Sequence, residues 1–472
     1  MSATSCAHVY NQSLSQSKDP PATWLIGFKL SLEHVWDAFL IYCLLEDALA
    51  RKEVLVVPHT GTQHDRFTEA VQARNQHVRV EGQPEITRYC NHCTRWYHGS
   101  DGKGMCFNMH FISCLSSCLS CCRSVNRKTS AVVTDSVCIG RPRCGEYKCQ
   151  VPLSSTKDRF CDQHRRLEAC CLIVGCHEDV IEGTLTCGNP EHQEIEHVHR
   201  ERGQSRFQLR DRLQRARNIH QGSHSSHRRA LAQRTTLDND DHVFFVDDHG
   251  QVRDSDAVDP DIPNTQNSTP QRNKKVRAKF TRSWTHNKQL AVAPCGIILG
   301  RDTMFGAEAI SSVAVCCHIL MYCGILLTRL QEFLKRVFHV ESLKPDHIIF
   351  DNNCGLTCHV KTDPFFADIG LSVDVFHFKS KHSENDTFCQ ENCNSAAFPE
   401  LLGKGGGWFF NSSVAEQTNV WFGGYYAICR EMHVDKYDFF LNQMILQRNH
   451  ITWEKLEQKG HQPGNWPVPR SL

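Results

Sequence analysis

The sequence lacks three features that would each assign it to a broad class of protein. It has no run of roughly 18–20 uninterrupted apolar residues, so we expect no membrane-spanning helix. The most apolar stretch, Val313 to Leu330, is interrupted by His318 and several Cys, and we interpret it as a buried helix. It has no excess of one charge, because 53 basic residues face 52 acidic ones, and any nucleic-acid-binding surface must therefore be local. Residues 1–21 are polar, so we expect no secretory signal peptide.

Cysteine and histidine are abundant instead. The chain of 472 residues has room for two or three domains and contains 26 Cys and 28 His. Fifteen of the Cys lie between Cys90 and Cys187. In an intracellular protein, which the missing signal peptide favours, such thiols stay reduced rather than forming a disulfide framework. Cys mixed with His at short, regular spacings is typical of zinc binding.

Two segments share one ligand spacing. They read Cys-x4-Cys-x11-Cys-x2-His and Cys-x4-Cys-x10-Cys-x4-His. Each segment supplies three thiolates and one imidazole, which is enough for a closed tetrahedral zinc site without an open catalytic position. The spacing leaves open whether each set binds its own ion or whether the two sets exchange ligand pairs. The predicted ligands are Cys144, Cys149, Cys161 and His164, followed by Cys171, Cys176, Cys187 and His192.

The composition changes along the chain indicate six segments. A helix capped by Ser31, with Leu40 and Leu44 on its apolar face, is expected near the start. Residues 105–126 have no period and no turn pattern, and are either an irregular insert or an artefact of gene prediction such as a translated intron. The segments are 22–104, a helical region with a CxxC pair; 105–130, an irregular Cys-rich insert; 131–200, a first strand and the paired zinc clusters; 201–235, a basic helix; 236–280, an acidic disordered linker; and 281–472, an α/β core.

Three acidic residues lie where catalytic carboxylates often lie. Asp135 ends the strand-like run Ala-Val-Val-Thr, Asp351 ends His-Ile-Ile-Phe, and Glu416 lies at the expected start of a helix. Carboxylates at strand ends and on a nearby helix can converge on two Mg²⁺ ions, which activate water and stabilise the leaving oxygen in phosphodiester cleavage. Asp302 is an alternative first acid, in a poorer strand context.

The C-terminal half resembles the KDZ (Kyakuja-Dileera-Zisupton) transposases. The likeness is carried by Asp351-Asn-Asn-Cys354, by Phe376-His377 through His382 and Cys389, and by Glu416 with Trp421. The Cys-rich part resembles the fifth and sixth kinds of CxC cysteine cluster associated with those transposases. The matching phrases there are Tyr89-Cys90-Asn-His-Cys93, Thr134-Asp135-Ser-Val-Cys-Ile-Gly140 and the two Cys/His sets.

This resemblance implies an RNase H-like α/β fold with inserted zinc clusters and a helical N-terminal extension. It also implies a DDE-type triad, in which Asp351 matches the second Asp, Glu416 the Glu and Asp135 the first Asp. The clusters would then be an insertion after the first strand. The chain departs from the expected pattern at Ser136, where the family would have Gly.

Further metal ligands are expected outside the two sets. Cys90 and Cys93 form a CxxC pair near the N-terminus. In the C-terminal half, four of Cys354, His377, His382, Cys389 and Cys393 could hold zinc, or they could be core thiols and buried imidazoles.

The sequence therefore predicts a transposase-like protein with structural Zn²⁺ and, if it is active, catalytic Mg²⁺ or Mn²⁺. Its partner would be DNA, with self-association left open, no membrane, no small-molecule substrate and a nuclear location that the basic run Lys274 to Lys279 supports. The alternative is a catalytically inactive zinc-dependent DNA- or protein-binding factor. A zinc-dependent ubiquitin-ligase-like adaptor fits less well, because cross-brace ligand spacing is missing.

Overall fold

The computed structural model describes most of the chain. The described residues are 3–16, 29–58, 65–97, 127–146, 149–206, 242–246, 252–254, 274–285, 287–305, 317–382, 386–403 and 405–466. The irregular segment 105–126 lies outside them, as does the expected basic helix beyond residue 206.

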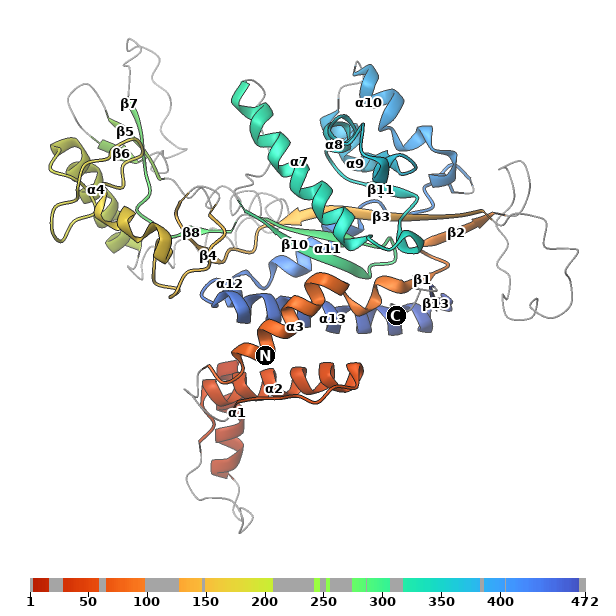
Figure 1. Cartoon of the computed structure of the whole chain (residues 1–472), viewed down its shortest axis with the longest axis horizontal. Helices are drawn as coiled ribbons and strands as arrows, with labels where there is room; N and C mark the ends of the chain where they lie inside the picture. The colour runs from red at the N-terminus through yellow and green to blue at the C-terminus, as the bar shows by residue number, and fades with distance from the viewer. Residues whose placement is uncertain are drawn as a thin grey trace, which may run out of the picture.

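A six-stranded mixed sheet forms the centre of the molecule (Figure 1). Its strands run in the order β10-β9-β3-β11-β12, and β2 pairs with the start of β3. Strands β3, β9 and β10 form an antiparallel meander, whereas β11 is parallel to β3 and β12 is parallel to β11. The bounds are β2 Thr94–Tyr97, β3 Arg127–Val137, β9 Asn287–Val292, β10 Ile298–Met304, β11 His347–Ile349 and β12 Gly370–Ser372.

Both faces of this sheet are buried along its central strands, which explains the apolar runs at residues 131–133 in β3 and 348–349 in β11. Val132 of β3 packs with one hydrophobic cluster, and its neighbours Ala131 and Val133 pack with the other. Helix α7 covers the first face with Leu330 and Phe333. The helices α11 and α13 cover the second face. These helices span Cys317–Val337 (α7), Val414–Gly423 (α11) and Val434–Gln458 (α13).

Short elements connect and cover the rest of this α/β layer. They are α8 Asn353–His359, α9 Val375–Lys381, α10 Thr387–Asn392, α12 Tyr426–Cys429, β13 Pro463–Asn465, and the 3₁₀ turns Glu341–Leu343, Pro364–Phe366, Ser395–Ala397 and Pro399–Leu401. The predicted buried helix at Val313 to Leu330 corresponds to α7 from Cys317 onward, and residues 313–316 lie outside the described part.

The N-terminal part is helical, and its predicted cap is confirmed. Ser31 accepts a hydrogen bond from the backbone N–H of His34, whose side chain accepts one from the backbone of Ser31, so that α2 starts with a capping box. Leu40 and Leu44 of α2 are buried against Phe439 of α13. The elements are α1 Ala3–Gln16, α2 Leu32–Arg51, α3 Thr68–Glu81, a 3₁₀ turn at Pro84–Thr87, and β1 Arg88–Cys90, which pairs with β13.

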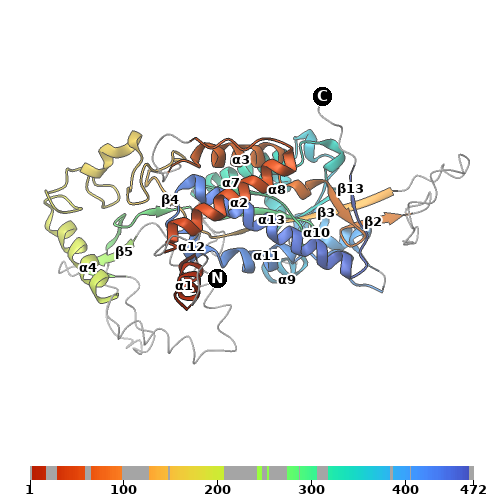
Figure 2. The same cartoon turned by 90° about the horizontal axis from the view of Figure 1, so that it is seen from below.

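A separate lobe carries the Cys/His-rich segment (Figure 2). The expectation of a disordered linker at 236–280 is wrong in part, because three of its segments form an antiparallel sheet in the order β6-β5-β7. Phe244 and Val276 from these strands are buried against Ile195 of α4. This acidic region therefore contains short apolar segments, and another element of the same lobe covers them. The lobe contains β4 Pro142–Arg143, a 3₁₀ helix Asp162–Ala169, α4 Pro190–Arg206, β5 His242–Val246, β6 Val252–Asp254, β7 Lys274–Ala278 and β8 Ser283–Trp284.

Among the described residues, no helix is long and apolar enough to cross a membrane.

Candidate functional site

The first Cys/His set, Cys144, Cys149, Cys161 and His164, gathers at one point beside β4. All four ligand atoms lie within 4.8 Å of one another. The Cys149 and Cys161 sulfurs are 3.8 Å apart, and His164 Nδ1 lies 3.5 Å from Cys144 Sγ and 3.3 Å from Cys161 Sγ. Zinc–sulfur bonds of about 2.3 Å and zinc–nitrogen bonds of about 2.0–2.1 Å in a tetrahedron give edges of about 3.8 and 3.6 Å. The donor set therefore fits zinc in both chemistry and spacing.

The second Cys/His set, Cys171, Cys176, Cys187 and His192, repeats this geometry. The sulfurs of Cys176 and Cys187 are 3.8 Å apart. His192 Nδ1 lies 3.6 Å from Cys171 Sγ and 3.2 Å from Cys187 Sγ. Each set is made only of its own consecutive ligands, so the structure favours two local sites over exchanged pairs.

The CxxC pair is joined by a residue that the sequence analysis missed. Cys295, in the turn between β9 and β10, places its sulfur within 4.8 Å of those of Cys90 and Cys93. No spacing rule could have found it, because it lies about 200 residues further along the chain.

The expected zinc site in the C-terminal half is smaller than predicted. Cys354, His382 and Cys389 come together, with His382 Nδ1 3.6 Å from Cys354 Sγ and 3.4 Å from Cys389 Sγ. The placement of His377 among these ligands needs correction, because its ring nitrogens face carboxylates instead. Cys393 also stays apart, with its sulfur 3.6 Å from Thr357 Oγ1.

The first two predicted acids lie at the same edge of the sheet. Strands β3 and β11 are parallel, and Val133 pairs with Ile349. Asp135 lies two residues after Val133, and Asp351 lies two residues after Ile349. Carboxyl ends of adjacent parallel strands point the same way, so their side chains meet there. The alternative first acid, Asp302, lies on β10, and its carboxylate forms an ion pair with Arg336 at 2.9 Å.

His377 connects the second and third predicted acids. Its Nδ1 lies 2.9 Å from Asp351 Oδ1, and its Nε2 lies 3.3 Å from Glu416 Oε1. Asp374, the N-cap of α9, lies 3.2 Å from the same Nδ1 and fixes the start of the helix that carries His377. A protonated imidazole ring would donate from both nitrogens to these acids.

Helix α11 carries two polar side chains that influence Asp135. Glu416 lies in its first turn, and Asn419 is three residues further on the same face. The Asn419 side-chain amide donates to Asp135 Oδ2 at 2.8 Å and to the Ser136 carbonyl at 3.1 Å. Asn419 was not among the residues predicted from the sequence, although its spacing from Glu416 on an expected helix was a usable signal.

The surroundings of Asp135 disfavour its charged form. Burial, and then the negative charges of Asp351 and Glu416, raise the pKa of Asp135 to about 7, against the lowering effect of the Asn419 hydrogen bond. Asp135, Asp351 and Glu416, the acidic cluster, thus lie close enough to repel one another. The acidic cluster is looser than the cysteine groups. In the described part of the chain, only the four Cys-containing groups bring three or more ligand atoms within 4.8 Å of one another.

One segment of the Cys/His-rich lobe is similar to a described protein family. Residues 133–198 match the family model described as a CxC6-like cysteine cluster associated with KDZ transposases. This stretch contains both Cys/His sets and begins within β3, just before Asp135. The searches of curated proteins and of solved structures gave no significant match. Residues 133–198 are therefore similar to the cysteine clusters associated with KDZ transposases, and this similarity links the chain to that group of proteins.

Proposed function

We propose that this chain is a KDZ-type transposase that cleaves DNA and transfers the cut strand with the help of Mg²⁺ or Mn²⁺. The observation that supports this most is the meeting of Asp135, Asp351 and Glu416, which come from two parallel strands and a covering helix. The raised pKa of Asp135 fits this role, because repelling carboxylates that are held together are relieved by a bound cation.

The sheet supports the RNase H-like part of the proposal. Its meander strands β3, β9 and β10 come before β11 and β12 in the sequence, and the parallel pair β11-β12 is added beside β3. This order fits the RNase H-like domain that the resemblance to KDZ transposases implies. Asp135 lies on β3 and Asp351 lies just after β11, at the same edge of two neighbouring parallel strands. The Cys/His lobe is then an insertion between the first and second strands of the domain.

The chain's own residues would divide the work as follows. Asp135, Asp351 and Glu416 would hold the divalent cations, and Asn419 would orient Asp135 through its 2.8 Å hydrogen bond. Mg²⁺ held there would activate water or a DNA 3′-hydroxyl as nucleophile and stabilise the leaving oxygen. His377 would keep Asp351 and Glu416 in position through its contacts with both carboxylates.

The zinc lobe would contact DNA, and the protein would act in the nucleus. Strand β7 supports this, because Lys275 and Arg277 are exposed on one side while Val276 and Ala278 are buried on the other. Exposed cations on a zinc-stabilised lobe suit phosphate contacts, which position a protein on DNA without reading its sequence.

A cleavage assay on the full-length zinc-loaded protein tests the proposal. The substrate is a DNA duplex that carries candidate transposon-end sequences, and the reaction contains Mg²⁺. We expect the parent to cleave this DNA, and each of the variants Asp135→Asn, Asp351→Asn and Glu416→Gln to lose the cleavage. The matched control is Asp302→Asn, an acid on the same sheet that is paired with Arg336 and should leave cleavage unchanged. Cleavage that survives in all three variants would contradict the assignment.

A second candidate function is a catalytically inactive zinc-dependent DNA- or protein-binding factor. The observation that favours it is the position of the His377 ring, which lies between Asp351 and Glu416 where a cation would bind. Zinc-dependent DNA binding without cleavage, on DNA substrates of several sequences and with either Mg²⁺ or Mn²⁺, would support this second function.

A further inference from the structure

Cys90, Cys93 and Cys295 bring three thiols together where three parts of the chain meet. Cys90 ends β1, Cys93 follows in the turn before β2, and Cys295 lies in the turn between β9 and β10. The sulfurs of Cys90 and Cys93 are 3.6 Å apart, and all three lie within 4.8 Å of one another. Cys90 is 1% and Cys93 is 5% exposed. This group lies outside the part of the chain that matches the cysteine-cluster family.

The turn around Cys90 holds the two sulfurs of the CxxC pair close together. The backbone N–H of Cys90 donates to Cys93 Sγ at 3.2 Å, and the backbone N–H of Cys93 donates to the Cys90 carbonyl at 3.1 Å. Zinc is the soft divalent ion that a cluster of cysteine sulfurs prefers, and it binds them as thiolates.

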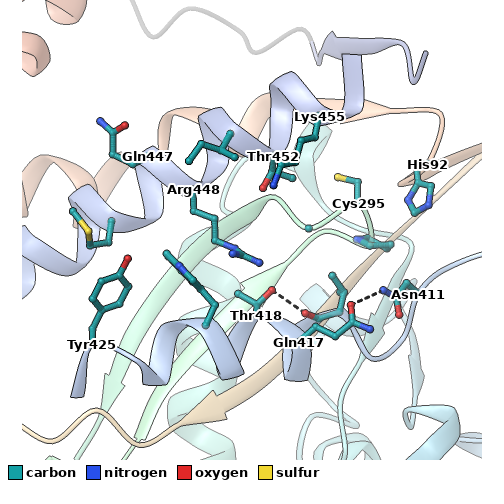
Figure 3. A pocket seen from close by; sticks show the side chains of 16 residues that line it. His92, Cys295, Asn411, Gln417, Thr418, Tyr425, Gln447, Arg448, Thr452 and Lys455 are labelled. Atoms are coloured by element: carbon teal, nitrogen blue, oxygen red, sulfur yellow. Dashed lines mark hydrogen bonds between the residues drawn. The ribbon is translucent and has the colours of Figure 1, made fainter. Parts of the chain in front are cut away.

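A fourth ligand is available at the cavity of about 530 Å³ that Figure 3 shows. Cys295 and His92 both line it and are labelled near the same end. His92 Nδ1 is buried and has no hydrogen-bond partner among the described residues. The neighbouring His461, 5.0 Å away between ring centroids, has its own Nδ1 2.9 Å from Asn91 Oδ1. His92, which lies between Cys90 and Cys93 in the sequence and lines the same cavity as Cys295, is therefore the imidazole that we assign to the metal.

We propose that Cys90, Cys93 and Cys295 bind a zinc ion, that His92 completes its coordination, and that this ion fastens the N-terminal segment to the central sheet. The ion joins β1 to the turn between β9 and β10. Because β1 pairs with β13, it also holds the C-terminal end of α13 in place. This zinc site is independent of both Cys/His sets and of the acidic cluster.

Counting zinc in the full-length protein tests the proposal. Native mass spectrometry before and after competition with a chromogenic zinc chelator would compare the parent with Cys295→Ala. The matched control is Cys43→Ala, which also removes a buried thiol but lies outside every metal group of the described residues. We expect Cys295→Ala to retain one zinc fewer than the parent under competition, and Cys43→Ala to match the parent. An unchanged zinc count in Cys295→Ala, or a disulfide between any two of the three cysteines in the freshly purified protein, would overturn the proposal.

His92→Ala tests the fourth ligand separately. We expect this variant to bind the same zinc at low chelator concentration and to lose one equivalent at least tenfold faster than the parent, because one of four ligands is gone. Release of that zinc at the parental rate would show that water or another group completes the site. The ring of His461 is the comparison, since His461→Ala should leave the release rate unchanged.

Discussion

Removing one ligand of the first Cys/His set should unfold one half of the zinc lobe and leave the second zinc in place. Cys161→Ala is the sharpest change, because Cys161 is fully buried and its sulfur contacts both Cys149 and His164. Cys170→Ala is its matched control, a thiol in the same lobe whose sulfur only approaches the Arg166 carbonyl, at 3.9 Å.

The magnitude follows from how little else holds the lobe together. Among the described residues, its hydrophobic cluster contains fourteen buried apolar side chains, four of which are the zinc-ligand cysteines themselves. Structural zinc sites contribute apparent free energies of about 10–16 kcal/mol in small zinc-binding peptides. Whole domains are stable by only about 5–15 kcal/mol. The loss of one site therefore exceeds what so small a core can supply, and the region from Cys144 to His164 should unfold.

Zinc counting and hydrogen exchange together measure this effect. Native mass spectrometry should show one zinc fewer for Cys161→Ala, and amide exchange should become fast over residues 149–164 while the second set stays protected. Cys170→Ala should match the parent in both measurements. Loss of two equivalents from the single variant would show that the sets exchange ligands, and an unchanged zinc count would refute the assignment of the first set.

Three further predictions concern the central domain. Asn419→Ala should weaken Mn²⁺ binding by about 10- to 150-fold, measured by calorimetry, because a hydrogen bond to a charged group contributes about 1.5–3 kcal/mol; unchanged affinity would separate Asn419 from the acids. His377→Ala should leave Mn²⁺ affinity equal to or higher than that of the parent, while His377→Lys should lower it, since a fixed cation would then compete with the metal. Lys288 is fully buried, and burial lowers its pKa to about 7. The pKa of Lys in an unfolded chain is about 10.4. Between those values the unfolded chain binds the extra proton, so stability should rise with pH by up to about 1.4 kcal/mol per unit, and Lys288→Met should remove that rise in a comparison of melting temperatures at pH 7 and 9.

Local patterns in the sequence predicted the parts of the site that depend on neighbouring residues. The two Cys/His sets are each made of ligands within about twenty residues of chain, so their spacing alone contains the geometry. Asp135 and Asp351 each follow a short apolar run, and the parallel pairing of β3 with β11 brings such strand ends together. The Ser31 cap is local in the same way.

The features that the sequence did not reveal depend on contacts between distant segments. Cys295 joins the CxxC pair only because the turn between β9 and β10 lies beside the end of β1. His377 has a spacing that suits zinc, but the direction of α9, set by the Asp374 cap, turns its ring toward Asp351 and Glu416. The strands within 236–280 were hidden because their few apolar residues are buried by another part of the lobe, not by one another alone.

Mn²⁺ bound at the acidic cluster is the most direct test of the account. Electron paramagnetic resonance of the full-length, zinc-loaded protein titrated with Mn²⁺ would count the bound ions, and crystals soaked in Mn²⁺ would locate them by anomalous scattering. We predict bound Mn²⁺ coordinated by Asp135, Asp351 and Glu416, with the His377 ring displaced from Glu416, and no such binding in Asp135→Asn. A protein with intact zinc sites that binds no Mn²⁺ at these carboxylates, with or without DNA, would contradict the catalytic proposal and leave a zinc-dependent binding factor.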